Sequence, residues 1–263
     1  MTQSLNPPIA REWDSGAYHR LSNPQFGWGQ KVLSRLRVRG DEVVLDVGCG
    51  TGRLTAELVK LLPCGRVIAT DLSENMLRRA RTTLQELKPR VSFVCADVQQ
   101  LPFVKRLDGI FSTAALHWVK DHERMLRELL TALKPGGWLM AQCGGGENLA
   151  RMREKVAALI ASPKYAHFFQ GWREPWNFVS AELMAERMRN AGFVDVKTWI
   201  EPGAFSLPDA ATFKQYLATV TVHQHLARID EPQLREEFLD DLIEQYGTEF
   251  YLDYWRLNME GKR

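Results

Sequence analysis

Short apolar runs alternate with segments of helical periodicity between residues 43 and 143, and no other feature of the sequence constrains the fold as strongly. Most of these runs lack strict alternation of apolar and polar residues, as is typical of strands buried on both faces. Strand–helix–strand units at this rhythm form right-handed crossovers, so we expect an α/β fold with a doubly wound, mostly parallel sheet. The five runs lie at residues 43–48, 66–71, 91–97, 107–113 and 137–143.

Individual residues and short motifs predict the helices and strands that lie between and after these runs. Leu54, Leu58 and Leu61 recur at helical spacing and predict an amphipathic helix, while Ser73 stands where the cap of the next helix belongs. Lys-Pro-Gly-Gly at 134–137 is expected to end a further helix and lead into the fifth strand. A strand at 192–201 and a β-prone last segment, 250–261, would bring the sheet to seven strands.

The chain outside this core reads as mainly helical. We expect an N-terminal helical cap at 1–40, a ligand-binding core at 41–146, a helical lid insertion at 147–190, and C-terminal strands with a second helical lid block at 191–263. No repeat or low-complexity linker separates these parts. The extra helices are therefore expected to cover the core as a lid.

Composition narrows the function classes. The chain has 263 residues, and its 34 basic and 32 acidic residues are well mixed, so no nucleic-acid partner is expected. No secretory signal and no apolar stretch of the ~18 residues that a membrane span needs are found, and none of the four cysteines forms a C-x-x-C pair. These observations favour a cytoplasmic protein with free thiols, as a monomer or homodimer, without a membrane partner.

A glycine-rich loop follows the first run. Gly48, Gly50 and Gly52 stand between a predicted strand and a predicted helix, an arrangement that aims backbone N–H groups and a positive helix end at an anion. Arg53 occupies the place of the third glycine of the dinucleotide pattern, and no G-K-[ST] follows as in a Walker loop. Asp71 and Asp97, at the ends of the next two strands, are suited to accept ribose hydroxyls and an adenine amino group. The sequence thus points to a ligand built on adenosine.

Five stretches, in order and spacing, resemble the class I S-adenosylmethionine-dependent methyltransferases: LDVGCGTG, ATDLSENML, ADVQQLPF, STAALHWVKDHERMLREL and LKPGGWLM. The resemblance implies an enzyme with a Rossmann-like fold and S-adenosylmethionine as cofactor. It also implies that the loop glycines approach the methionine part, that Asp71 holds the ribose, and that Asp97 faces the adenine between Leu72 and Val98. The full candidate cofactor set is Tyr18, Trp28, Asp46, Gly48, Cys49, Gly50, Thr51, Gly52, Asp71, Leu72, Met76, Asp97, Val98 and Ala114.

A narrower similarity links STAALHWVKDHE and LLTALKPGGWLM to small-molecule carboxyl methyltransferases, among them the trans-aconitate, juvenile hormone acid and malonyl-carrier-protein families. In the juvenile hormone family a Gln near the N-terminus and a Trp after a His hold the substrate carboxylate, and Gln25 and Trp118 match those positions. The resemblance implies O-methylation of a small carboxylic acid, with Gln25, His117 and Trp118 as candidate catalytic residues. Methylation of a hydroxyl, amine or carbon with His117 as base remains an alternative.

Two other classes are weighed against this interpretation. A nicotinamide dehydrogenase is disfavoured by Arg53 and by the Asp97 motif, whereas a non-catalytic S-adenosylmethionine-binding protein stays open. His223 and His225 suggest a metal, but residues two apart on a helix point to different sides, and no third ligand is evident. We expect no metal site.

Overall fold

The structure is a computed structural model that describes residues 12–263; the first eleven positions of the expected N-terminal cap lie outside the described residues. The described chain forms two compact units. The larger unit contains residues 12–146, 176–201 and 256–263, and the smaller unit contains residues 147–175 and 202–255.

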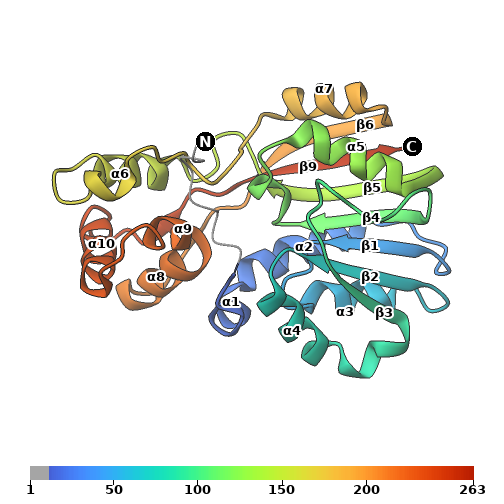
Figure 1. Cartoon of the computed structure of the whole chain (residues 1–263), viewed down its shortest axis with the longest axis horizontal. Coiled ribbons are helices and arrows are strands. Elements are labelled where there is room, and N and C mark those ends of the chain that lie inside the picture. Colours follow the sequence, from blue (N-terminus) through green and yellow to red (C-terminus); the bar gives the residue numbers. More distant parts are fainter. Residues whose placement is uncertain (1–11) are drawn as a thin grey trace, which may run out of the picture. The chain divides into compact units, whose positions relative to one another are not determined.

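The larger unit contains a seven-stranded sheet, ordered β3-β2-β1-β4-β5-β9-β6 (Figure 1). The first five strands in the chain run parallel, and β9 is antiparallel to β5. This arrangement confirms the expected mostly parallel, doubly wound sheet. The strands are β1 (Val43–Val47), β2 (Arg66–Asp71), β3 (Val91–Cys95), β4 (Leu107–Thr113), β5 (Leu133–Gly144), β6 (Val194–Pro202) and β9 (Trp255–Lys262).

Helices cover both faces of this sheet (Figure 1). Leu45 and Val47 of β1 belong to one apolar core, which also takes buried residues from α5 (His122–Ala132) and α7 (Ala181–Ala191). Val44, which directly precedes Leu45 in sequence, belongs to a second core with α2 (Asn23–Arg35), α3 (Arg53–Lys60) and α4 (Glu74–Thr83). Successive residues of a strand point to opposite faces of the sheet, so β1 contributes side chains to both apolar cores. The short helix α1 (Ser15–Leu21) precedes α2.

Shorter elements complete the two units. In the larger unit, 3₁₀ turns occupy η1 (Gln85–Arg90) and η2 (Leu116–Trp118). The smaller unit is mainly helical and contains a short two-stranded pairing between β7 and β8. Its elements are α6 (Ala150–Ile160), η3 (Ala166–Phe169), β7 (Phe205–Ser206), α8 (Ala210–Tyr216), the π-helical turn η4 (Leu217–Thr221), α9 (His223–Leu226), α10 (Pro232–Glu244) and β8 (Tyr251–Leu252).

Three local expectations need correction. Residues 134–137 do not separate a helix from a strand, because β5 already begins at Leu133. They form a bulge within β5, and the register of β5 with β4 shifts between Leu133 and Trp138. The last strand does not close an edge of the sheet, because β9 lies between β5 and β6. The expected boundary at residue 190 also differs from the observed one: residues 176–201, with α7, belong to the sheet unit. The role of the smaller unit as a lid stays a prediction.

Candidate functional site

The three loop glycines differ in what a side chain would meet at each position. Gly48 has φ +71°, and a Cβ there would lie 2.3 Å from Cβ of Ala115. Gly52 has φ +82° and caps α3, and a Cβ there would lie 2.9 Å from Cδ1 of Leu84. At Gly50, with φ +55°, a Cβ would find only Tyr18, 4.0 Å away. Gly48 and Gly52 therefore permit close packing, whereas Gly50 leaves open space above the loop.

Backbone and carboxylate groups at the end of β2 hold the loop. The carbonyl of Thr70 accepts hydrogen bonds from the N–H groups of Gly48 and Cys49. One carboxylate oxygen of Asp71 accepts from Gly50 N–H and the other from Ser73 N–H, both at 2.9 Å. A carboxylate has about four lone-pair sites, so Asp71 keeps capacity for further donors such as ribose hydroxyls. Burial raises the pKa of Asp71 above its usual value, in spite of these backbone donors.

Asp46 of β1 is the second carboxylate of this region and is almost fully buried. It accepts a hydrogen bond of 2.6 Å from the Thr55 hydroxyl of α3. Burial, with a smaller contribution from the nearby Asp71, raises the pKa of Asp46 to about 7. A cationic ligand at this point would favour the ionised form of Asp46.

A pocket that is partly open to solvent lies over the loop. Eight candidate residues line it: Tyr18, Gln25, Asp46, Gly48, Cys49, Gly50, Thr51 and Ala114. The structure thus brings together residues of α1, α2, the glycine loop and the end of β4. The lining combines backbone N–H groups, a carboxylate and aromatic carbon, which suits a ligand with both charged and apolar parts.

The remaining cofactor candidates lie outside this pocket. Asp97 accepts from the backbone N–H of Gln99 at 2.9 Å, which makes the tight turn after β3. Leu72 is exposed (42%), while Met76 and Val98 are buried. Trp28 is buried in α2, one helical turn after Gln25. The assignment of these residues to ribose or adenine contacts stays a prediction.

His117 lies in the turn η2, after β4, and is buried. Its Nδ1 accepts a hydrogen bond from the Gly144 N–H at 3.3 Å, which assigns the proton of the neutral ring to Nε2. Burial, and then the positive charge of Arg256, lowers the pKa of His117 well below its usual value. The imidazole is therefore neutral at physiological pH and offers an N–H donor.

Aromatic rings surround His117 and the half-buried Trp118. The Trp118 ring centroid lies 5.4 Å from that of Trp13 and 6.2 Å from that of Trp176. Phe178 lies 5.5 Å from the His117 ring and stacks on Trp176. Together, Trp13, Trp118, Trp176 and Phe178 form an aromatic wall beside the turn, and its members come from three separate parts of the chain.

Several residues that line the pocket are not among the candidates predicted from the sequence. The missed pocket residues are Ser22, Phe26, Arg53, Leu54 and Thr113. In the sequence Arg53 stands out only as a departure from a dinucleotide pattern. In the structure its guanidinium lies 4.3 Å from the Phe26 ring centroid and donates to Asn23, which connects α3 to α2. A second arginine, Arg256, was also missed and is buried at the start of β9. No local pattern marks its function.

Comparison with known proteins identifies the family. A model described as "Methyltransferase domain" matches residues 44–137. The trans-aconitate 2-methyltransferase of Deinococcus radiodurans is 33% identical over 221 residues, which cover 83% of this chain and 84% of that protein. The chain belongs to the class I S-adenosylmethionine-dependent methyltransferases.

Two further comparisons differ in how much of each chain they cover. The trans-aconitate 2-methyltransferase of Azoarcus sp. (strain BH72) is 36% identical over 130 residues, 49% of this chain, and the match spans half (50%) of that relative's length. A putative methyltransferase from Bacillus halodurans has the same fold, with a TM-score of 0.61 at 19% identity over 89% of this chain and 97% of that one. The chain and that structure thus share a fold.

The site of this methyltransferase fits S-adenosylmethionine. The open space above Gly50 would admit the methionine portion, and the carboxylates of Asp46 and Asp71 would be available as acceptors for ammonium and hydroxyl donors of such a ligand. Within residues 12–263, no group of three or more His, Cys, Asp or Glu side chains is placed to hold a metal ion. No helix of the same described part is both long enough and apolar enough to cross a membrane.

Proposed function

We propose that this methyltransferase methylates a carboxylate oxygen of a small organic acid. The state of His117 carries the proposal: its Nδ1 already accepts the Gly144 N–H, so the ring offers Nε2–H as a donor and has no free acceptor nitrogen to serve as a base. A carboxylic acid with a pKa near ~4 is ionised at neutral pH and needs no base. A hydroxyl acceptor would need one. The names of the curated relatives support the same class of acceptor.

The cofactor supplies a methyl group that is electrophilic because it is bound to a sulfonium. We assign the methionine end of the cofactor to the pocket over Gly50, with Asp46 near its ammonium group. Asp71 would hold the ribose, and Asp97 the adenine between Leu72 and Val98. In this assignment the chain contributes binding and orientation, which supply roughly 7–11 kcal/mol of barrier lowering in favourable cases.

Gln25 and Trp118 would hold the reacting carboxylate through the Gln25 amide and the Trp118 indole N–H, beside the His117 donor. The aromatic wall, of which Trp118 is part, would limit the access of water to this position. Since the transfer removes charge from the acceptor, a water-poor environment favours it.

A direct test uses S-adenosylmethionine with a labelled methyl group and a panel of small acids, alcohols and amines. We expect labelled product from at least one acid and release of the label by mild alkali, because a methyl ester hydrolyses whereas a methyl ether or N-methyl amine does not. Label transferred in an alkali-stable form would support the alternative, methylation at another oxygen, nitrogen or carbon. Binding of the cofactor without transfer to any acceptor would support a non-catalytic S-adenosylmethionine-binding protein.

Two variants then separate carboxylate from hydroxyl chemistry on the substrate so identified. For a carboxylate, His117→Gln should keep kcat within about tenfold, while Trp118→Phe, which removes one N–H donor to a charged group, should raise KM by roughly tenfold. For a hydroxyl, the His117 variant should lose about 10²–10⁴ in kcat, and the Trp118 variant should be little changed. That second pattern would exclude the carboxylate proposal.

A further inference from the structure

β9 has one apolar face and one polar face, although it lies inside the sheet. Leu257 and Met259 are buried in the core beneath α5 and α7. Asn258 alternates with them and therefore faces the opposite side of the sheet, where α2 lies. Asn258 is fully buried, and so is Gln142 of the neighbouring strand β5. Buried amides cost stability unless their donors and acceptors are paired, so both side chains need partners.

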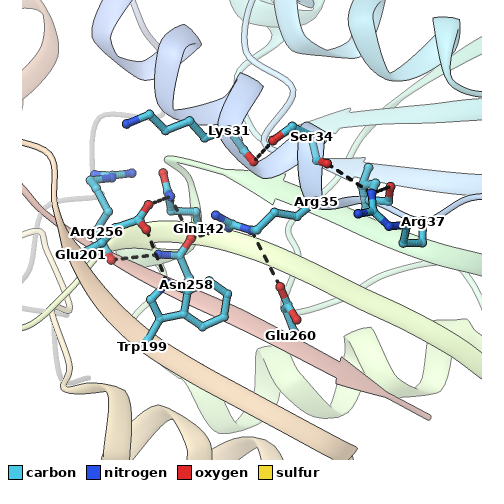
Figure 2. A network of polar contacts seen from close by, with 11 residues as sticks. Lys31, Ser34, Arg35, Arg37, Gln142, Trp199, Glu201, Arg256, Asn258 and Glu260 are labelled. Carbon is cyan, nitrogen blue, oxygen red and sulfur yellow. Dashed lines mark hydrogen bonds and ion pairs between the residues drawn. The ribbon is translucent and has the colours of Figure 1, made fainter.

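A closed set of polar contacts surrounds these two amides (Figure 2). The side-chain oxygen of Asn258 accepts from the Arg35 guanidinium of α2 at 2.6 Å and from the Gln142 amide at 2.9 Å. The Gln142 amide also donates to Glu201 of β6 at 3.1 Å, and Glu201 accepts from the Trp199 indole N–H at 3.4 Å. The Arg35 guanidinium carbon lies 5.0 Å from the Trp199 ring centroid, which closes the set. We call these five side chains the polar cluster.

The hydrogen bonds of the polar cluster have fixed directions. Two donors meet at one atom of the Asn258 side chain, so that atom is the oxygen, and both of its lone pairs are used. Both N–H bonds of the Gln142 amide are used as well, on Asn258 and Glu201. Apolar packing tolerates small shifts of a helix, whereas directional bonds in a buried network define one arrangement. The polar cluster therefore fixes the Arg35 end of α2 to β5, β6 and β9.

The other end of α2 belongs to the candidate site. Gln25 and Phe26 line the pocket over the glycine loop, and the Phe26 ring centroid lies 4.3 Å from the guanidinium carbon of Arg53, which directly follows that loop. Between its two ends α2 approaches α3 closely at Gly29, where a Cβ would lie 2.1 Å from Cδ1 of Leu54. A contact at a glycine brings two helices together at one point, about which a helix can tilt.

We propose that Arg35 is a positioning residue for the cofactor: through the polar cluster it fixes the tilt of α2, and thereby the place of Phe26 in the pocket. This inference rests on the assignment of that pocket to the methionine end of the cofactor, and it does not depend on the acceptor. Phe26 lies three residues before Gly29 and Arg35 six residues after it. A shift of about 2 Å at the Arg35 end would therefore move Phe26 by about 1 Å in the opposite direction. A gap of about 1 Å removes up to roughly half of the dispersion attraction between facing atoms.

Calorimetric titration with S-adenosylhomocysteine, at a temperature well below Tm, tests the proposal. For Arg35→Gln we expect the affinity to fall about tenfold, and Arg35→Lys, which keeps the charge and a donor, should lie between this variant and the wild type. In the Phe26→Ala background the change of Arg35 to Gln should cost less than about threefold, because the side chain that Arg35 positions is missing. Independent effects would multiply instead.

Two controls separate positioning from a general loss of stability. Met188→Ala removes a buried side chain of α7 from the apolar core, so it should lower Tm and leave the affinity for S-adenosylhomocysteine unchanged. Arg37 lies just beyond the end of α2 and donates to the backbone carbonyls of Ser34 and Leu36 (Figure 2). Because Arg37 is exposed and bonds to its own segment of chain, Arg37→Gln should change neither quantity.

Three results would overturn the proposal. Wild-type affinity in Arg35→Gln, together with a lower Tm, would show that the polar cluster contributes stability alone. Losses that multiply in the double variant would show that Arg35 does not act through Phe26. If the wild type does not bind S-adenosylhomocysteine, the assignment of the cofactor is wrong, and this inference with it. Circular dichroism establishes the folding of each variant, and Arg35→Lys carries the test should Arg35→Gln not fold.

Discussion

The carboxyl edge of the sheet has two ends that are built in different ways. At the β1–β2 end, one stretch of chain between Asp46 and Ser73 makes the site, largely from backbone N–H groups, glycine conformations and two carboxylates. At the β5–β9 end, side chains from distant segments act on one another: His117 of η2 accepts from Gly144 of β5, and the charge of Arg256 of β9 acts on the His117 ring. The first end would hold the cofactor and the second the acceptor.

This difference between the two ends bears on how easily the choice of cofactor and the choice of acceptor could be altered. Backbone N–H donors are present whichever side chains the loop carries, and a left-handed backbone conformation favours glycine. A loop of this kind is therefore suited to a ligand that does not change from one enzyme to the next. Side chains contributed by separate elements can be exchanged one at a time. Acceptor choice should therefore be easier to alter than cofactor choice.

The largest expected effect concerns the loop itself. Gly50→Val should reduce S-adenosylmethionine affinity by about 100-fold or more, because its side chain would enter the open space over the loop; its positive φ should cost only about 1–2 kcal/mol of stability, so the protein stays folded. Gly48→Val should lower the free energy of unfolding by about 3 kcal/mol or more, since the same kind of strain is joined by the contact of its Cβ with Ala115. Calorimetry and urea unfolding measure the two effects. Equal loss of stability in both variants would remove the distinction between the two glycines.

Asp71→Ala should weaken S-adenosylmethionine and S-adenosylhomocysteine by roughly 2–4 kcal/mol, more than tenfold, since two charge-assisted hydrogen bonds are lost. Because Asp71 also holds Gly50 N–H, part of this loss reflects a loosened loop. Ser73→Ala is the control: it removes the α4 cap, about 1 kcal/mol of stability, and should leave affinity unchanged. Wild-type affinity in the Asp71 variant would exclude this carboxylate from the cofactor end.

Asp46 should make cofactor binding depend on pH. Its pKa of about 7 means that half of the protein without ligand carries a neutral Asp46 near pH 7. A cationic ligand favours the ionised form, so affinity should rise with pH, by up to about tenfold per unit below pH 7, and level off above it. Calorimetry in buffers of different ionisation enthalpy should detect proton release in the wild type. The same release from Asp46→Asn would show that another group titrates.

His122 supports the acceptor end through the turn that carries His117. Its Nε2–H donates to the Leu116 carbonyl at 3.2 Å, and Arg187 donates to its Nδ1 at 3.1 Å, so the ring is neutral. Burial, and then the Arg187 charge, lowers the pKa of His122 to about 4. Between about pH 6.5 and 4, His122 is protonated in the unfolded chain but stays neutral in the native state. The free energy of unfolding should therefore fall as pH falls, by up to about 1.4 kcal/mol per pH unit.

Urea unfolding at pH 7 and pH 5 measures this dependence. His122→Gln, whose amide can replace both hydrogen bonds, should show a shallower decline than the wild type. Replacement of the exposed His167 by Gln serves as the matched control and should leave the decline as it is. A decline that is unaffected by the His122 variant would assign the acid sensitivity to other groups.

The same contrast explains what could be predicted from the sequence. The strands, the Ser73 cap and the loop glycines depend on neighbours in the chain, so periodicity and turn chemistry indicate them. The position of β9 and the site of Arg256 depend on pairing between residues far apart, for which a single sequence holds no local signal. The alternation of Arg256, Asn258 and Glu260 with Leu257 and Met259 predicts a strand with one polar face, yet not which helix covers that face.

The place of β9 in the sheet also has a consequence for folding. β6 precedes β9 in the chain but lies beyond it in the sheet, so the edge of β5 has no permanent neighbour until residues 255–262 insert. Such late, long-range pairing is intrinsically slow, and an open strand edge can meanwhile recruit another chain. Because the same insertion delivers Arg256, whose charge acts on the His117 ring, a newly made molecule would acquire its glycine loop first and the full surroundings of His117 last. The end of the site that carries His117 would then mature after the end that carries the loop.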